Sequence, residues 1–224
     1  MRGGMACYVL IHGAGSTAWY WHLVAPELRA RGHEVLTPDL PVDDDNAGLS
    51  AYVETVVDAI GERSDVVLVA QSLAGFVAPI VATRTRVALI VLVAAMVPKP
   101  NETLGAWWSD TGHAALGINM DDPVELFLHD VPPDIAAESA QHVRDQSGRP
   151  FDDMWPLDRW PDVPTRALIG RDDRLFPADF QRRVVRERLG FDPDEIDGGH
   201  LPALARPVAL VDRLETYRMQ IAPR

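Results

Sequence analysis

The chain contains almost no cysteine and almost no lysine. Cys7 is its only cysteine, so no disulfide can form within the chain, and a framework held by disulfides is excluded. Lys99 is its only lysine, and the other basic residues are arginines. No stretch of the sequence reaches the ~18 to 20 consecutive apolar residues that a membrane-spanning helix requires. We therefore expect a cytoplasmic protein that has no membrane partner.

Acidic residues outnumber basic ones, which gives a formal net charge of −12 at pH 7. Such a surface repels nucleic acid and anionic membranes alike, so we expect neither as a partner. The run of aspartates at 43–45 has too few oxygen ligands around it for a calcium loop, and a solvated turn is the simpler interpretation. We expect no metal and no cofactor.

With 224 residues, of which 47% are apolar, the chain is large enough to bury a substantial core as one domain covering 1–224. Short apolar runs alternate with segments of helical periodicity, which is typical of parallel βαβ units. The predicted strands are 5–11, 33–37, 65–70, 87–93, 164–169 and 192–197. The predicted helices are 19–31, 49–63, 73–84, 177–189 and 204–220.

The third predicted strand ends at Ser72, in a turn of small residues that leads into a helix. A nucleophile elbow has this form, because a strained strand-to-helix turn exposes one side chain above the sheet. The usual pattern is G-x-S-x-G. Here Ala70 and Ala74 occupy the two glycine positions, and Gly75 follows one place late. A serine at such a position is also a common helix N-cap, so the motif alone leaves both interpretations open.

Two further segments follow the serine in the chain. Asp173 lies three residues after Gly170, which ends an apolar run, and Pro177 lies four residues further on. His200 follows a pair of glycines, shortly before the last predicted helix. Lone acids and histidines are common, but a serine, an acid and a histidine in this order and at these places favour a catalytic triad.

These segments resemble the elbow, the G-x-x-D-x-x-x-P acid loop and the histidine loop of the α/β-hydrolase superfamily. The resemblance covers about residues 5–220. It implies an α/β fold with a six-stranded parallel sheet, in the order 2-1-3-4-5-6, flanked by helices and bearing a small helical cap. The two antiparallel strands that open fuller members of the superfamily have no counterpart here.

The resemblance also implies a role for each residue of the site. Ser72 would attack, His200 would accept its proton, and Asp173 would orient the imidazole. The backbone N–H groups of Leu73 and Ala14 would form the oxyanion hole, since the segment from His12 resembles the H-G-x-G oxyanion segment of the family. For His12 itself a structural role is expected, in which the side chain holds the loop backbone by hydrogen bonds.

Residues 98–161 interrupt the alternation of strands and helices, and we expect them to form a cap over the elbow. This segment is rich in aromatic residues and methionine, most of which should pack in the core of the cap. Some should line an apolar substrate pocket. The candidates are Trp107, Trp108, Met120, Phe127 and Trp155.

Two stretches, 12–19 and 93–104, are similar to the plant methyl-ester esterase and hydroxynitrile lyase branch and its bacterial relatives. In the lyases a lysine follows the catalytic histidine, whereas Leu201 occupies that place here. We therefore expect a carboxylesterase that acts on a small, largely apolar ester, as a monomer or a homodimer. Three alternatives stay open: another reaction on the same triad (thioester, lactone or carbon–carbon hydrolysis), a hydroxynitrile lyase, and a ligand-binding module without catalysis.

Overall fold

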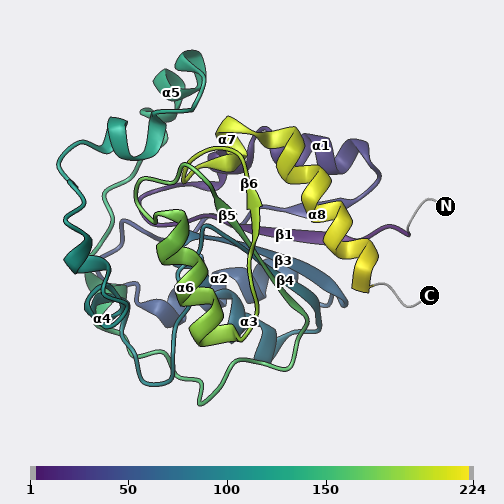
Figure 1. Cartoon of the computed structure of the whole chain (residues 1–224). Coiled ribbons are helices and arrows are strands. Elements are labelled where there is room, and N and C mark those ends of the chain that lie inside the picture. Colours follow the sequence, from purple (N-terminus) through teal and green to yellow (C-terminus); the bar gives the residue numbers. More distant parts are fainter. Residues whose placement is uncertain (1–3, 222–224) are drawn as a thin grey trace.

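The computed structural model describes residues 4–221, and its centre is a parallel β-sheet of six strands in the order β2-β1-β3-β4-β5-β6 (Figure 1). Every neighbouring pair of strands is parallel, and the predicted strand order is confirmed. The strands are β1 (Cys7–Ile11), β2 (Glu34–Leu36), β3 (Val66–Gln71), β4 (Val87–Val93), β5 (Thr165–Gly170) and β6 (Asp194–Ile196).

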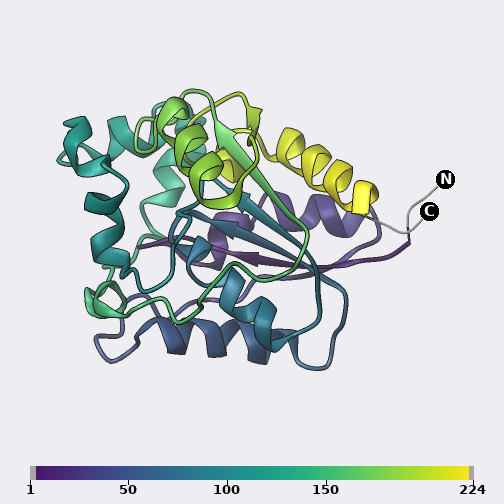
Figure 2. The ribbon, with the colours of Figure 1, turned by 60° about the horizontal axis from the view of Figure 1, so that its bottom comes forward.

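Helices cover both faces of this sheet (Figures 1 and 2). One face is covered by α2 (Leu49–Ile60), α3 (Ala78–Arg84) and α6 (Ala178–Leu189), and the other by α1 (Val24–Ala30), α7 (Pro202–Ala205) and α8 (Pro207–Ile221). The central strands are buried on both sides, so side chains that alternate along a strand enter two different cores. In β3, for example, Leu68 belongs to the first core and Val69 to the second.

Three predicted helices are wrong in part. The segment predicted at 19–31 begins as the 3-10 turn Ala18–Trp21, and α1 starts only at Val24. Proline and the strained elbow interrupt the other two. The segment predicted at 204–220 forms α7 and α8, with a break at Arg206 and Pro207. Proline favours the first turn of a helix and disfavours helical backbone in the residue before it, and Arg206 has φ −141° and ψ 49°. The segment predicted at 73–84 begins as the 3-10 turn Ser72–Gly75, and α3 starts only at Ala78.

The residues between β4 and β5 form an insertion, which we define as residues 98–161. It contains α4 (Leu104–Asp110), α5 (Pro133–Ser139), two 3-10 turns (His113–Leu116 and Arg149–Asp152) and the π-helical turn Val124–Leu128. Figure 2 shows these short elements gathered toward one end of the sheet. The insertion is anchored to α6 by Glu102, a buried carboxylate that accepts hydrogen bonds of 2.5 and 2.8 Å from Arg188.

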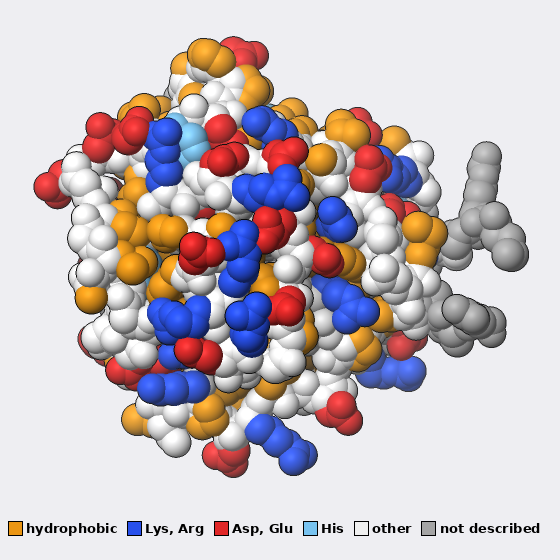
Figure 3. Space-filling model, in the orientation of Figure 1, with side chains coloured by type: hydrophobic (Ala, Val, Ile, Leu, Met, Phe, Trp, Pro, Cys, Tyr) orange, Lys and Arg blue, Asp and Glu red, His pale blue; other side chains and the backbone are white. Residues whose placement is uncertain are grey.

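Charged side chains of both signs are interspersed on the face that carries α6 (Figure 3). Arg182 pairs with Asp179 and Glu195, and Arg186 pairs with Asp192. Exposed pairs of this kind contribute little to stability, about 0 to 1 kcal/mol each. Within residues 4–221, no helix combines the length and the apolar character needed to cross a membrane.

Candidate active site

Ser72 lies at the carboxyl end of β3 in left-handed backbone, with φ 53°. This conformation is strained for a residue with a side chain, and it occurs where surrounding contacts enforce it. The carbonyl of Ser72 accepts a hydrogen bond of 2.9 Å from the N–H of Met96. A Cβ on Gly75 would lie 1.9 Å from the Met96 carbonyl oxygen. The glycine that follows the elbow one place late is therefore needed for this close approach.

Ser72, His200 and Asp173 form one chain of hydrogen bonds. His200 Nε2 lies 3.1 Å from Ser72 Oγ, and His200 Nδ1 lies 2.8 Å from Asp173 Oδ2. The side chains of Asp173 and His200 are 0% and 2% exposed. This arrangement permits one function for each group, since the imidazole can accept the serine proton at one nitrogen while the carboxylate fixes the other.

The loop after β5 holds the Asp173 carboxylate from several directions. Oδ1 accepts the N–H groups of Leu175 at 2.9 Å and Phe176 at 2.8 Å, and Oδ2 accepts the side-chain amide of Gln181 at 3.2 Å in addition to His200. These donors occupy the acceptor sites of an ionised carboxylate, which has room for about four. Four hydrogen bonds therefore fix the orientation of the buried Asp173 carboxylate.

Asp172 and Asp173 are neighbours in the sequence but differ in their surroundings. Asp173 is buried and bonds to His200, whereas Asp172 is exposed and accepts the N–H of Gly198 at 3.3 Å. Gly170 lies where a Cβ would come within 2.5 Å of the Gly198 and Gly199 carbonyl oxygens. The absence of a side chain at Gly170 thus lets the acid loop and the histidine loop pass closely.

The loop after β1 lies next to the elbow, as the sequence predicts for an oxyanion loop. A Cβ on Gly13 would come within 2.8 Å of Ser72 Cβ, so glycine is required for the approach. Within residues 4–221, neither Ala14 N–H nor Leu73 N–H donates to a protein acceptor. Leu73 occupies the first turn of its helix, where an N–H has no partner inside the helix. Both groups stay the predicted oxyanion donors.

His12 holds this loop from within the core. Leu40 N–H donates to His12 Nε2 at 3.0 Å, so that nitrogen is the acceptor and Nδ1–H donates to the Gly13 carbonyl at 2.9 Å. The expected structural role of His12 is confirmed.

The five predicted pocket residues occupy very different places. Trp107 and Trp155 are each 1% exposed, and their indole N–H groups donate to the Val97 and Phe76 carbonyls, so both are core side chains of the insertion. Trp108 is partly buried and packs 5.8 Å from the ring of Phe176. Met120 is 51% exposed on the surface. Of the five, Phe127 is the residue whose ring contacts the site, at 5.6 Å from the His200 ring.

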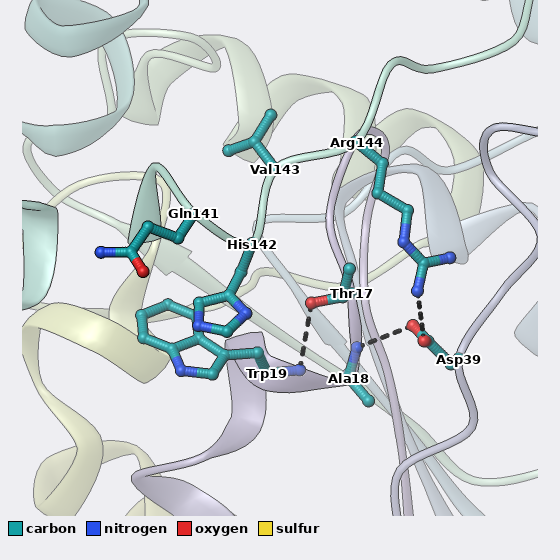
Figure 4. A pocket seen from close by; sticks show the side chains of 8 residues that line it. All are labelled: Thr17, Ala18, Trp19, Asp39, Gln141, His142, Val143 and Arg144. Atoms are coloured by element: carbon teal, nitrogen blue, oxygen red, sulfur yellow. Dashed lines mark hydrogen bonds and ion pairs between the residues drawn. The ribbon is translucent and has the colours of Figure 1, made fainter. Parts of the chain in front are cut away.

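A cavity of about 320 Å³ lies beside the oxyanion loop and is lined by none of these five residues. Figure 4 shows it between the loop after β1 and the part of the insertion that carries Gln141 and Arg144. The Trp19 ring is stacked between two imidazoles, with ring centres 4.1 Å from His22 and 4.5 Å from His142. The side of the cavity that carries Asp39 and Arg144 is polar, and these two side chains form an ion pair with each other.

The insertion also contacts each of the other loops of the site, through residues that the sequence analysis did not identify. Gln146 accepts the Gly15 N–H at 3.1 Å, and His113 Nε2 lies 2.6 Å from the Leu175 carbonyl in the acid loop. Asp130 accepts the Gly199 N–H at 2.9 Å. Burial lowers the pKa of His113, although its bond to Leu175 opposes this. Such contacts join segments far apart in the chain, so no local pattern indicates them.

Within residues 4–221, no three His, Cys, Asp or Glu side chains are grouped closely enough to hold a metal ion. The chemistry that the arrangement supports directly is proton transfer between Ser72 and His200, with the developing charge on the imidazole balanced by Asp173.

Known proteins resemble this chain over nearly its whole length. Probable esterase PIR7A of Oryza sativa subsp. indica is 30% identical, in an alignment that covers 96% of this chain and 97% of the relative. Methyl jasmonate esterase 1 of Vitis vinifera is also 30% identical, with 93% and 95% covered. The crystal structure of polyneuridine aldehyde esterase superposes with a TM-score of 0.83 at 19% identity, over 96% of this chain and 100% of the other. That superposition supports the fold.

The model of the alpha/beta hydrolase family matches residues 8–213, which include the elbow, the acid loop and the histidine loop. Together with the strand order and the relatives above, this match shows that the chain belongs to the alpha/beta hydrolase family.

Proposed function

We propose that this protein hydrolyses carboxylic esters through a triad of Ser72, His200 and Asp173. The observation that carries the proposal is the continuous chain of hydrogen bonds from Ser72 Oγ through the imidazole to the buried carboxylate. The names of the relatives support ester hydrolysis, since they include Probable esterase PIR7A and Methyl jasmonate esterase 1.

In the proposed reaction, Ser72 Oγ attacks the ester carbonyl while His200 Nε2 takes the hydroxyl proton. The negative charge that develops on the carbonyl oxygen would be bound by the Leu73 and Ala14 N–H groups, each worth about 3 kcal/mol in comparable enzymes. His200 then gives its proton to the leaving alkoxide, and an acyl-enzyme remains on Ser72. Water repeats the same steps, with His200 again as the base, and releases the acid.

The surroundings of His200 favour an apolar, uncharged substrate. Phe176 and Phe127 approach the imidazole with ring centres at 5.0 and 5.6 Å. The carboxylates of Asp173 and Asp130 both hydrogen-bond to His200 or to its loop, so a substrate with a further negative charge would be repelled. We infer that neutral esters of small aliphatic or aromatic acids are the substrate class.

A panel of esters tests this proposal. We expect kcat/KM to rise from acetate to hexanoate, by a factor that reflects about 0.8 kcal/mol for each methylene until the pocket is full. An aromatic methyl ester should be cleaved, and a succinate half-ester of matched length should be poor. A preference for the half-ester would contradict the apolar pocket and would make Arg144 and Arg149 the first residues to examine.

The alternative reactions separate in the same assays. Cyanide release from a cyanohydrin without ester cleavage would identify a lyase, which the apolar side chain of Leu201 after the histidine disfavours. Labelling of the wild-type protein by a serine-directed fluorophosphonate excludes a vestigial triad. Thioesters and lactones belong in the panel because the same triad can cleave them. The cytoplasmic location and the monomer or homodimer stay predictions.

A further inference from the structure

His129 and Asp130 follow the π-helical turn Val124–Leu128 of the insertion and lie against the loop that carries His200. A Cβ on Gly199 would come within 2.7 Å of His129 Cε1 and 2.9 Å of Asp130 Oδ1. A Cβ on Gly198 would lie 2.6 Å from Asp130 Oδ2. The two glycines before His200 are therefore needed because these two side chains press on the loop backbone.

Asp130 forms one hydrogen bond with this loop. Its Oδ2 accepts the N–H of Gly199, the residue directly before His200, at 2.9 Å. The side chains of His129 and Asp130 are only 9% and 12% exposed. Across residues 4–221, Asp130 Oδ1 and both His129 ring nitrogens find no hydrogen-bond partner, and the closest approach between the two groups is 4.0 Å. The one hydrogen bond that Asp130 forms is therefore directed at the backbone of the histidine loop.

The same loop has a second carboxylate acceptor, which allows a comparison. Gly198 N–H donates to Asp172 at 3.3 Å, but Asp172 is exposed to water. A hydrogen bond to a buried carboxylate is shorter and stronger than one to a solvated group. Of the two, Asp130 is the one expected to fix the loop. The backbone of the next residue, His200, is also held, because the side-chain amide of Gln71 donates to the His200 carbonyl at 3.3 Å.

We propose that Asp130 is a positioning residue: it fixes the loop so that His200 Nε2 stays in reach of Ser72. This inference rests on the function proposed above. A misplacement of about 1 Å in a catalytic group can cost about 10²-fold in rate. Asp130→Ala should therefore lower kcat by about 10- to 100-fold with little change in KM, because the substrate-binding side chains are untouched.

Two matched variants sharpen this prediction. Asp130→Asn keeps an oxygen that can accept the Gly199 N–H, so it should recover most of the activity. Asp134→Ala makes the same chemical change at an exposed position of the same insertion and should behave as wild type. A loss in all three variants, or in none, would overturn the positioning role.

A signal that does not depend on turnover comes from proton NMR. The Nδ1–H of His200, buried against Asp173, should give a resolved downfield resonance, which is assigned by its absence in His200→Ala. In Asp130→Ala this resonance should broaden or disappear, whereas Asp130→Asn and Asp134→Ala should retain it. If the wild-type protein cleaves no ester but the resonance still depends on Asp130, the proposed function fails and the positioning role stands.

Circular dichroism and thermal melting establish that each variant is folded. If Asp130→Ala does not fold, Gly199→Ala replaces it, because its methyl group would separate the loop from Asp130. Loss of the His200 resonance in folded Gly199→Ala then supports the proposal. A folded variant of either kind that retains the wild-type kcat and the wild-type resonance overturns it.

Discussion

The loops at the carboxyl ends of the strands and the insertion differ in how completely their polar groups are paired. In the loops, the Asp173 carboxylate accepts hydrogen bonds at both oxygens, and His200 is bonded at both ring nitrogens. In the insertion, one oxygen of Asp130 and both ring nitrogens of His129 have no hydrogen-bond partner within the described residues. The catalytic groups of the loops thus have all their hydrogen-bonding positions filled, while the part of the insertion next to the histidine loop holds that loop by the single hydrogen bond from Gly199 N–H to Asp130.

This difference separates two kinds of effect. Changes in the loops should alter the chemical step, because they remove a group that moves a proton or bears charge. Changes in the insertion should alter positioning, substrate choice or stability. Ser72→Ala and Asp173→Asn test the loops, Arg188→Met tests the attachment of the insertion, and Glu215→Gln tests a region remote from both.

Ser72→Ala is expected to have the largest effect. The attacking oxygen is lost, so turnover of a short p-nitrophenyl ester should fall by about 10⁶-fold, the size of the loss in a comparable serine enzyme. The fold should persist, since the smaller side chain removes one hydrogen bond at the surface of the site. A folded variant with the wild-type rate would exclude Ser72 from the mechanism, and His200→Ala should show a loss of similar size.

Asp173→Asn should lower kcat by about 10⁴-fold, because an amide cannot stabilise the imidazolium or select the correct tautomer. Asp172→Asn is the matched control, since this exposed neighbour makes no contact with the His200 ring. Steady-state kinetics of the two variants compares them directly. Reversed effects would mean that the acid has been assigned one residue too far along the loop.

Arg188→Met should destabilise the protein by about 3 to 5 kcal/mol, because it leaves the Glu102 carboxylate buried with its main ion-pair partner removed. The free energy of unfolding from urea titrations measures this cost. The double variant Arg188→Met with Glu102→Leu should recover much of it. If the single variant unfolds within about 0.5 kcal/mol of wild type, this pair does not anchor the insertion.

A polar cluster at the opposite end of the sheet gives a smaller, pH-dependent effect. Burial raises the pKa of Glu215, but hydrogen bonds from Arg218, Tyr8 and His33 outweigh it and lower the pKa to about 2. A carboxyl pKa that is lower in the folded protein than in the unfolded chain, where it is about 4.3, stabilises the fold at pH values above about 4.3. This stabilisation is lost as the pH falls toward 2.

Glu215→Gln should therefore cost about 1 to 3 kcal/mol at pH 7, allowing for partial solvent screening. The difference from wild type should shrink steadily below about pH 4. Chemical denaturation at several pH values measures it, with the exposed Glu62→Gln as control. A difference that stays constant down to pH 3 would show that the cluster acts by packing and not by charge.

The same comparison explains what the sequence could predict. The places of Ser72, Asp173 and His200 follow from local patterns, because an elbow, an acid loop and a glycine-rich turn are each encoded within a few residues. The strand order came from the family resemblance that these segments carry. The insertion could not be predicted in this way. Trp107 and Trp155 were candidates for the pocket and lie in the core, since aromatic composition alone does not tell which side chains of a short helix or a loop are buried. The contact of Asp130 with Gly199 joins residues 69 positions apart.

Peptide mapping of the fluorophosphonate-labelled protein tests the central claim most directly. The account predicts one covalent label on Ser72 in the wild-type protein. It also predicts that Ser72→Ala takes up no label and that His200→Ala labels far more slowly, because the hydroxyl then has no base. A label on another residue, or equal labelling of wild type and His200→Ala, would contradict it.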